Sequence, residues 1–214
     1  MQNTTTILME LPMDVYIYHE ETPNIASLQI ANLTKIYNNL NISFPDISAN
    51  SGDLIYLIAN TGSGKTTFCE IIAKFIKYDT GEIFINNNNI DNINVFEYIH
   101  YISQFPEHNL IGPTWKDDLL LWGIENNDYE DLHDCPIWKL SFGQKKALAF
   151  TALIHNPRNI WVLDEPYAGL DYDLANKLDN IIKNFLKNGG IVIVTANSVG
   201  NAFIRSLRTG GTNK

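Results

Sequence analysis

The sequence contains little cysteine and few basic residues, and each shortage excludes a class of function. Cys69 and Cys135 are the only cysteines and lie far apart. We therefore expect no disulfide framework and no cysteine-based zinc site, and a reducing compartment is the default. Fifteen lysines and arginines stand against 24 aspartates and glutamates, for a net charge of −9. Because nucleic acids and anionic lipids attract positive surfaces, we expect no nucleic-acid partner and no polybasic contact with lipid.

Long hydrophobic runs are absent as well. No stretch approaches the ~20 consecutive apolar residues of a membrane-spanning helix. The polar segment 1–10 has no basic start typical of a signal peptide. We therefore expect a cytoplasmic chain that would reach the membrane peripherally, through a partner that spans it. With 214 residues, of which 45% are hydrophobic, the chain is long and apolar enough for one well-buried domain.

Three short apolar runs predict strands that are buried on both faces, as in a parallel sheet. The runs are LIYLIA at 54–59, IWVLD at 160–164 and IVIVT at 191–195. Apolar residues at helical spacing occupy 68–76 and 174–186, and Gly189-Gly190 stops the second of these helices. Strands and helices in alternation predict an α/β fold with an open, doubly wound sheet.

Two further segments have recognisable local patterns. The strand pattern disappears between 106 and 140, and we predict a small, mostly helical insertion there. The asparagine run at 86–89 predicts a surface turn after a short strand at 82–85. Neither pattern points to chemistry by itself.

The start of the chain carries no recognisable motif. Residues 1–27 are therefore treated as an N-terminal extension of unknown role, before a main domain at 28–214. Within the extension, Val15 and Ile17 alternate with tyrosines and predict an edge strand.

The strongest functional pattern is the loop ANTGSGKTT at 59–67, between a predicted strand and a predicted helix. Such a turn directs backbone N–H groups and the positive end of the helix dipole into one concavity, which suits phosphate. Gly62 and Gly64 permit positive φ and a close backbone approach. Lys65 supplies a positive charge to the β- and γ-phosphates, and Thr66 offers a hydroxyl to Mg²⁺. We predict that ATP and Mg²⁺ bind here, through Asn60, Thr61, Gly62, Ser63, Gly64, Lys65, Thr66 and Thr67.

Later motifs resemble those of ATP-binding-cassette (ABC) proteins. The segment LSFGQ at 140–144 is similar to their signature motif, with Phe142 where glycine is commoner. IWVLDEP at 160–166 resembles the Walker B strand with its following glutamate, AGLD at 168–171 resembles the D-loop, and Gln104 fits the Q-loop. These motifs occur in family order and together span 28–197, which is most of the chain. The resemblance implies a P-loop NTPase (RecA-like) parallel core, an antiparallel β region and a short helical subdomain.

The resemblance also implies a role for each matching residue. Glu165 would polarise or deprotonate the attacking water, with Lys65 and Gln104 completing the catalytic group. Asp164, Thr66 and Gln104 would hold Mg²⁺, and Tyr37 would stack on adenine or serve as an ordinary aromatic. Two such subunits would sandwich ATP between one phosphate loop and the partner's signature motif. The signature residues implied in that contact are Ser141, Gly143 and Gln144.

A narrower resemblance covers Gln104 to Gly123, QFPEHNLIGPTWKDDLLLWG. It is similar to the segment after the Q-loop in energy-coupling-factor ATPases, which drive cobalt, nickel and vitamin uptake. That likeness implies a transmembrane subunit whose short coupling helix docks beside Gln104. Glu107 would suit a basic segment of that partner, or is an ordinary solvated charge.

Two positions depart from the family pattern and leave alternatives open. Ala59 replaces the first glycine of the loop, which would cost roughly 1 kcal/mol if that position needs positive φ. Ala196, followed by Asn197, occupies the place of the switch histidine. The chain is then a slower ATPase in which Asn197 partly substitutes, or a degenerate half of a heterodimer that hydrolyses little ATP at its own site. A non-transport ABC ATPase is a further alternative.

Overall fold

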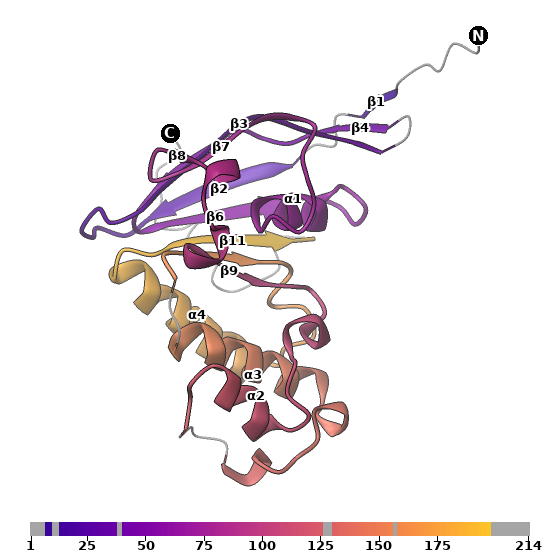
Figure 1. The fold of residues 1–214 in the computed structure, drawn as a ribbon, viewed down its shortest axis with the longest axis vertical. Helices are drawn as coiled ribbons and strands as arrows, with labels where there is room; N and C mark the ends of the chain where they lie inside the picture. Colours follow the sequence, from indigo (N-terminus) through magenta and orange to yellow (C-terminus); the bar gives the residue numbers. More distant parts are fainter. Residues whose placement is uncertain (1–6, 10–12, 38–39, 126–129, 156–157, 198–214) are drawn as a thin grey trace.

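A five-stranded sheet at the centre of the molecule contains the strands that position the site (Figure 1). The computed structural model describes residues 7–9, 13–37, 40–125, 130–155 and 158–197. From edge to edge, the strands are β2 (Asp14–His19), β6 (Asp53–Ile58), β11 (Ile191–Ala196), β10 (Ile160–Leu163) and β9 (Ile99–Ile102). Every neighbouring pair is parallel except β2 with β6. The predicted parallel core is therefore confirmed.

Helices cover both faces of this sheet, which explains the unbroken apolar runs. Along β6, Ile55 and Leu57 pack on the side of the first helix, whereas Leu54 and Tyr56 pack on the side of two later helices. The three helices are α1 (Lys65–Ile72), α3 (Phe142–His155) and α4 (Tyr172–Lys187). Because successive strand residues point to opposite faces, both sets must be apolar. Each such buried aliphatic side chain contributes about 1.5–3 kcal/mol relative to exposure.

A second, mostly antiparallel sheet lies on the α1 side of the core (Figure 1). Its strands are β1 (Ile7–Met9), β3 (Ser27–Tyr37), β4 (Leu40–Ser43), β5 (Ile47–Asn50), β7 (Thr80–Ile85) and β8 (Asn88–Asn89). Asn86 and Asn87 have φ of 50° and 63° and join β7 to β8, so the predicted asparagine turn is confirmed. The sheet matches the antiparallel region that the family resemblance implied.

The predicted insertion at 106–140 is a set of short helices beside α3 (Figure 1). They are η3 (Pro106–Asn109), α2 (Trp115–Leu121), η4 (Glu130–Leu132) and η5 (Ile137–Lys139). Asp118 is 1% exposed, and its carboxylate accepts hydrogen bonds from the N–H groups of Ile111 (2.7 Å) and Gly112 (2.8 Å). These bonds tie the incoming loop to α2. No helix in the described ranges is long and apolar enough to cross a membrane.

The N-terminal edge strand predicted at Val15 and Ile17 is confirmed as β2. It pairs with β6 in register from Asp14 opposite Ile58 to His19 opposite Asp53. Part of the segment assigned to an N-terminal extension thus lies in the same sheet as the strand that leads into the phosphate loop.

The first helix is shorter than predicted. Periodicity extended it to Ile76, but α1 ends at Ile72. Lys74 has a left-handed φ of 59°, and the N–H groups of Phe75 and Ile76 both donate to the Glu70 carbonyl, at 2.8 and 3.4 Å. These wider turns close the helix, as in C-terminal caps of the Schellman type. Phe75 consequently leaves the buried face and is 61% exposed.

Candidate functional site

The predicted phosphate loop forms the turn between β6 and α1. Gly62 and Gly64 have φ of 82° and 86°, which glycine adopts without strain, and Gly64 is the N-cap of α1. Ser63 is 4% exposed, yet its Oγ has no hydrogen-bond partner within the described part of the chain. A buried hydroxyl without a partner at a helix N-terminus fits an oxygen of a bound anion.

The remaining loop residues surround this turn. Asn60 and Thr61 are exposed, as is Gly62, and Thr67 is half-buried in the first turn of α1. The carbonyl of Asn60 accepts a hydrogen bond from the Ser63 N–H at 3.2 Å. The exposed side of the loop therefore leaves access for a ligand from solvent.

Ala59 does not carry the strain that its departure from glycine suggested. It is not among the residues with positive φ, and it is 6% exposed at the end of β6. Its N–H donates to the Ala196 carbonyl at 3.2 Å. The conditional cost of roughly 1 kcal/mol therefore does not arise, because this position needs no left-handed backbone.

Lys65 is almost buried and fully hydrogen-bonded. Its Nζ donates to the carbonyls of Ala59 (2.8 Å) and Asn60 (3.0 Å) and to Asn197 Oδ1 (2.7 Å). These bonds use all three ammonium donors. The Glu165 Oε1 atom lies a further 3.6 Å from Nζ. Phosphate oxygens that enter the loop must therefore compete with these acceptors for the lysine.

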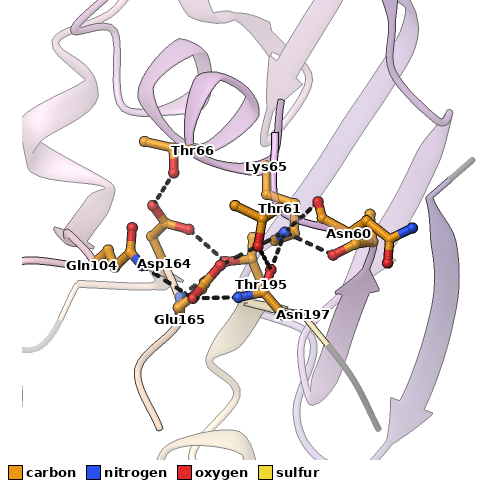
Figure 2. A network of polar contacts seen from close by, with 10 residues as sticks. Asn60, Thr61, Lys65, Thr66, Gln104, Asp164, Glu165, Thr195 and Asn197 are labelled. Carbon is orange, nitrogen blue, oxygen red and sulfur yellow. Dashed lines mark hydrogen bonds and ion pairs between the residues drawn. The ribbon is translucent and has the colours of Figure 1, made fainter. Parts of the chain in front are cut away.

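Asp164 lies just beyond β10 and is fully buried, but its carboxylate is satisfied. Thr66 Oγ1 donates to Oδ2 and Thr195 Oγ1 donates to Oδ1, both at 2.6 Å (Figure 2). The structure thus brings together Thr66 and Asp164, two of the three residues predicted for Mg²⁺. The third, Gln104, donates through Nε2 to Glu165 Oε2, and its role as a metal ligand remains a prediction. Mg²⁺ prefers a few protein oxygens together with phosphate and water oxygens, so this donor set fits the ion.

Glu165 lies at the centre of the polar network in Figure 2. Its Oε2 accepts hydrogen bonds from Gln104 Nε2 (3.2 Å) and Asn197 Nδ2 (2.8 Å). The Glu165 backbone has a left-handed φ of 45°, although it is not glycine. Such strained residues concentrate at functional sites and persist because their surroundings hold them. The predicted catalytic residues Lys65, Gln104 and Glu165 therefore meet in one place.

Three further residues contact the Asp164–Glu165 segment. Sequence reasoning did not identify Thr195 or Lys146, and it named Asn197 only as one of two alternatives. Thr195 accepts a hydrogen bond from the Glu165 N–H at 2.9 Å while it donates to Asp164. Asn197 joins Lys65 to Glu165 and accepts from Thr61 Oγ1 at 3.4 Å. Lys146 is fully buried in α3, and burial lowers its pKa to about 8. A polar residue directly after a buried strand was the available signal for Asn197, whereas nothing local marks Lys146.

The signature residues form a separate group at the start of α3. The Ser141 N–H donates to Gln144 Oε1 (2.8 Å) and the Gln144 N–H donates to Ser141 Oγ (3.2 Å), a reciprocal cap. Because α3 and α1 cover opposite faces of the core sheet, Ser141, Gly143 and Gln144 do not join the phosphate loop of their own chain (Figure 1). Their predicted contact with a partner's nucleotide remains a prediction.

Tyr37 stands apart from the network as well. It ends β3, is 42% exposed, and its ring centroid lies 5.5 Å from Lys35 Nζ. Among its described contacts, none reaches the phosphate loop. The role of Tyr37 in adenine stacking therefore remains a prediction.

Comparison with known proteins agrees with this geometry. A family model described as ABC transporter matches residues 42–168. The chain is 32% identical to the cytochrome c biogenesis ATP-binding export protein CcmA of Reclinomonas americana over 193 residues, which are 81% of this chain and 86% of that protein. It is 31% identical to the energy-coupling factor transporter ATP-binding protein EcfA2 of Clostridioides difficile over 198 residues, 78% of this chain and 69% of that one.

A solved structure shows the same fold. The ATP-binding cassette MJ0796, a dimer in a post-hydrolysis state with ADP and Pi, superimposes with a TM-score of 0.68 at 21% identity. The match covers 83% of this chain and 90% of that one. At this identity the likeness supports the fold only.

Proposed function

The chain belongs to the ABC transporter ATP-binding family, and we propose that it is a hydrolysing subunit of the energy-coupling-factor type. The observation that supports hydrolysis best is the Glu165 carboxylate, which lies between Gln104 and Asn197 and 3.6 Å from Lys65 Nζ. A carboxylate in that position can accept a proton from water beside a phosphate held by the loop.

Each residue of the site has a distinct role in the proposed reaction. The loop amides and Lys65 bind and orient the triphosphate. Thr66 and Asp164 would hold Mg²⁺, which supplies positive charge to the phosphate oxygens when bound. Glu165 accepts the proton of the attacking water, and Gln104 donates to the Glu165 carboxylate and limits its motion. Both positioning and charge stabilisation then come from groups that are already in place.

Asn197 favours the hydrolysing form over the degenerate one. The family's switch histidine is replaced by Ala196, which has no polar side chain, but the next residue fills the space between the lysine and the carboxylate. An amide can accept from Lys65 and donate to Glu165 at the same time. We assign to Asn197 the role of orienting Glu165. We expect ATP hydrolysis to be slower than in relatives that have the histidine.

We further propose that ATP joins two subunits. Ser141 is exposed and lies on the opposite side of the sheet from the phosphate loop of its own chain. Its hydroxyl and the N-terminal amides of α3 suit a phosphate that a second copy or a related subunit presents. Gly143 leaves space there: outside its own helix backbone, and among the described residues, an added Cβ would meet only Leu174, at 3.7 Å.

The proposed membrane partner docks beside Gln104. An aromatic group lies against β9, the strand that precedes Gln104: Phe75 and Phe96 are 61% and 53% exposed, and the Phe75 ring contacts Tyr101 of β9 at 5.5 Å between centroids. Glu107 is already paired, because Lys145 Nζ lies 2.7 Å away and lowers the pKa of that carboxyl. We therefore assign docking mainly to the aromatic group, and place the chain on the cytoplasmic face of a membrane.

Phosphate release by the purified full-length chain with Mg-ATP tests hydrolysis. We expect measurable turnover, a loss of about 10²- to 10³-fold in kcat for Glu165→Gln with ATP still bound, and a large loss of binding for Lys65→Ala. Tight ATP binding without turnover in the parent would support the degenerate alternative instead. If Lys65→Ala bound ATP with the parental affinity, the assignment of the nucleotide site to this loop would be wrong.

The transporter type needs a separate test. We expect the chain to co-purify from its native host with a second cassette subunit and a polytopic membrane protein, and Phe75→Ser with Phe96→Ser to weaken that association. The surface variant Lys183→Ser on α4 serves as the control. A consistently soluble, partner-free dimer would favour a non-transport ABC ATPase.

A further inference from the structure

A buried lysine outside the phosphate loop contacts the turn that carries Glu165. Lys146 lies in the second turn of α3 and is 0% exposed. Its Nζ donates to the carbonyls of Glu165 (2.9 Å), Pro166 (3.0 Å) and Ala168 (3.0 Å). A buried ammonium is unfavourable unless its donors are satisfied, and here all three of them are used.

The backbone of this turn needs outside support. Glu165 has the left-handed φ of 45°, and the turn itself contains only two backbone hydrogen bonds among its described contacts, from Ala168 N–H to Glu165 O (3.1 Å) and from Leu170 N–H to Tyr167 O (3.2 Å). Left-handed backbone at a non-glycine residue persists only where the surroundings hold it. Outside the turn, the Glu165 N–H donates to Thr195 Oγ1 of β11, and the Lys146 ammonium supplies a separate link from helix α3.

Phe142 of the signature motif completes the contact. Its ring centroid lies 5.1 Å from Lys146 Nζ, within the range of a cation–π interaction. The ring also lies against Gly169, where a Cβ would come within 2.9 Å of two ring carbons. Gly169 has φ of 72°, so glycine is needed there for the backbone as well. The unusual Phe142 therefore packs on the D-loop of its own chain.

We propose that Lys146 is a positioning residue that holds the Glu165 turn and joins it to the signature helix α3. The inference rests on the proposed ATPase activity and deepens it. Phe142 and Lys146 belong to the helix that starts with the signature motif, while the three carbonyls belong to the segment of the catalytic carboxylate and the D-loop. A shift of α3 against the core sheet is thereby passed directly to the backbone of Glu165.

A buried lysine is energetically unfavourable if its only role is to fill space. Burial disfavours its charged form, while the nearby Glu165 and Asp164 carboxylates favour that form, and the pKa of Lys146 falls to about 8. An apolar side chain of similar length, such as methionine, would fill the same space without this cost. What methionine cannot do is satisfy the three carbonyls, so the function of the lysine lies in its hydrogen bonds.

The test compares Lys146→Met with Lys146→Gln in the full-length protein. We expect kcat for Mg-ATP to fall about 10- to 100-fold in Lys146→Met, because a small displacement of Glu165 suffices, and to fall less in Lys146→Gln, which keeps two donors. The affinity for fluorescent mant-ATP should stay within about two-fold of the parent, since the phosphate loop is untouched. Lys145→Met, which removes the exposed ion pair with Glu107 one residue earlier, is the matched control and should keep the parental kcat.

Amide hydrogen exchange gives a readout that does not depend on turnover. In Lys146→Met, the amides of Ala168 and Leu170 should exchange faster, while those of β10 should not change. Parental kcat, or unchanged exchange at these amides, in a folded Lys146→Met protein would overturn the proposal. So would a loss of ATP affinity and thermal stability in step with kcat, which indicates a merely structural role.

If Lys146→Met does not fold, Lys146→Gln and Lys146→Arg are judged by the same criteria. Absence of turnover in the parent would contradict the proposed function, and the exchange data would still decide on Lys146.

Discussion

At the scale of single residues, the site depends on which polar atoms share one carboxylate. Glu165 Oε2 accepts from Gln104 and from Asn197, and Lys65 Nζ lies near Oε1. The Asn197 amide both accepts and donates, as a neutral histidine can, but it has no pKa near neutrality. An asparagine at this position can therefore orient Glu165 without adding pH dependence.

Replacing Asn197 should show this role directly. We expect Asn197→Ala to lower kcat by about 10²- to 10³-fold and to change KM for ATP much less, because a positioning interaction is lost in the transition state. Steady-state phosphate release measures both constants, with the exposed Asn184→Ala on α4 as the control.

Two substitutions to histidine refine the same prediction. Ala196→His should raise kcat by no more than a few-fold, since Asn197 already fills the space. Asn197→His should make kcat pH-dependent around pH 6.5, where imidazole titrates. A parental kcat in Asn197→Ala, or a large gain in Ala196→His, would mean that Asn197 does not orient Glu165.

At the scale of elements, His100 lies at the junction between the core sheet and the insertion. It belongs to β9, is 5% exposed, and its ring meets the Trp122 ring, just after α2, edge to face at 5.5 Å between centroids. Neither ring nitrogen has a hydrogen-bond partner in the described ranges. Burial, and to a smaller extent Arg158, lowers the pKa of His100 to about 4. The insertion is thus packed against a histidine that must stay neutral.

This packing should make stability fall in acid. The unfolded chain binds a proton at His100 below about pH 6.5, whereas the folded chain resists protonation down to about pH 4. The free energy of unfolding is therefore unaffected by His100 above about pH 6.5. It decreases by roughly 3 kcal/mol as the pH falls from 6.5 to 4. Urea unfolding of the parent and of His100→Phe over this range measures the difference. A parent and variant with parallel pH profiles would show that His100 is not the group responsible.

Sequence patterns predicted elements better than their ends. The three buried strands and α4 lie where apolar runs and periodicity placed them, because burial on both faces leaves a strong signal. Helix α1 ends early because Lys74 adopts left-handed φ and Glu70 O accepts two wider-turn bonds, neither of which the hydrophobic spacing encodes. The role of Asp118 as a cap for the Ile111 and Gly112 amides was likewise invisible in the pattern.

At the scale of the whole molecule, an N-terminal strand completes the ATP-binding core. β2 forms the edge beside β6, the strand that leads into the phosphate loop. Without β2, the backbone of β6 would be exposed along its length, and open edges of this kind invite pairing with other chains. We infer that β2 protects the core as well as extending it.

Truncation isolates this contribution. Removing residues 1–19 deletes β1 and β2, and we expect a decrease in Tm of more than about 5 °C together with concentration-dependent aggregation. Removing residues 1–12 deletes β1 alone and is the control. Thermal unfolding and light scattering compare the two proteins. Equal behaviour of both truncations would show that β2 adds little to the core.

The sequence by itself determined the class of fold and the place of the phosphate loop, and it predicted the chemistry of Lys65, Thr66, Asp164 and Glu165. These properties reside in short contiguous patterns: apolar runs, glycines before a lysine, carboxylates after a buried strand. Only the tertiary structure decided which groups contact Glu165. Asn197 and Lys146 are 32 and 19 residues away from it along the chain, and packing of β11 and α3 against β10 brings them to its side chain and backbone. Such contacts depend on how separate elements pack, and no local pattern specifies that.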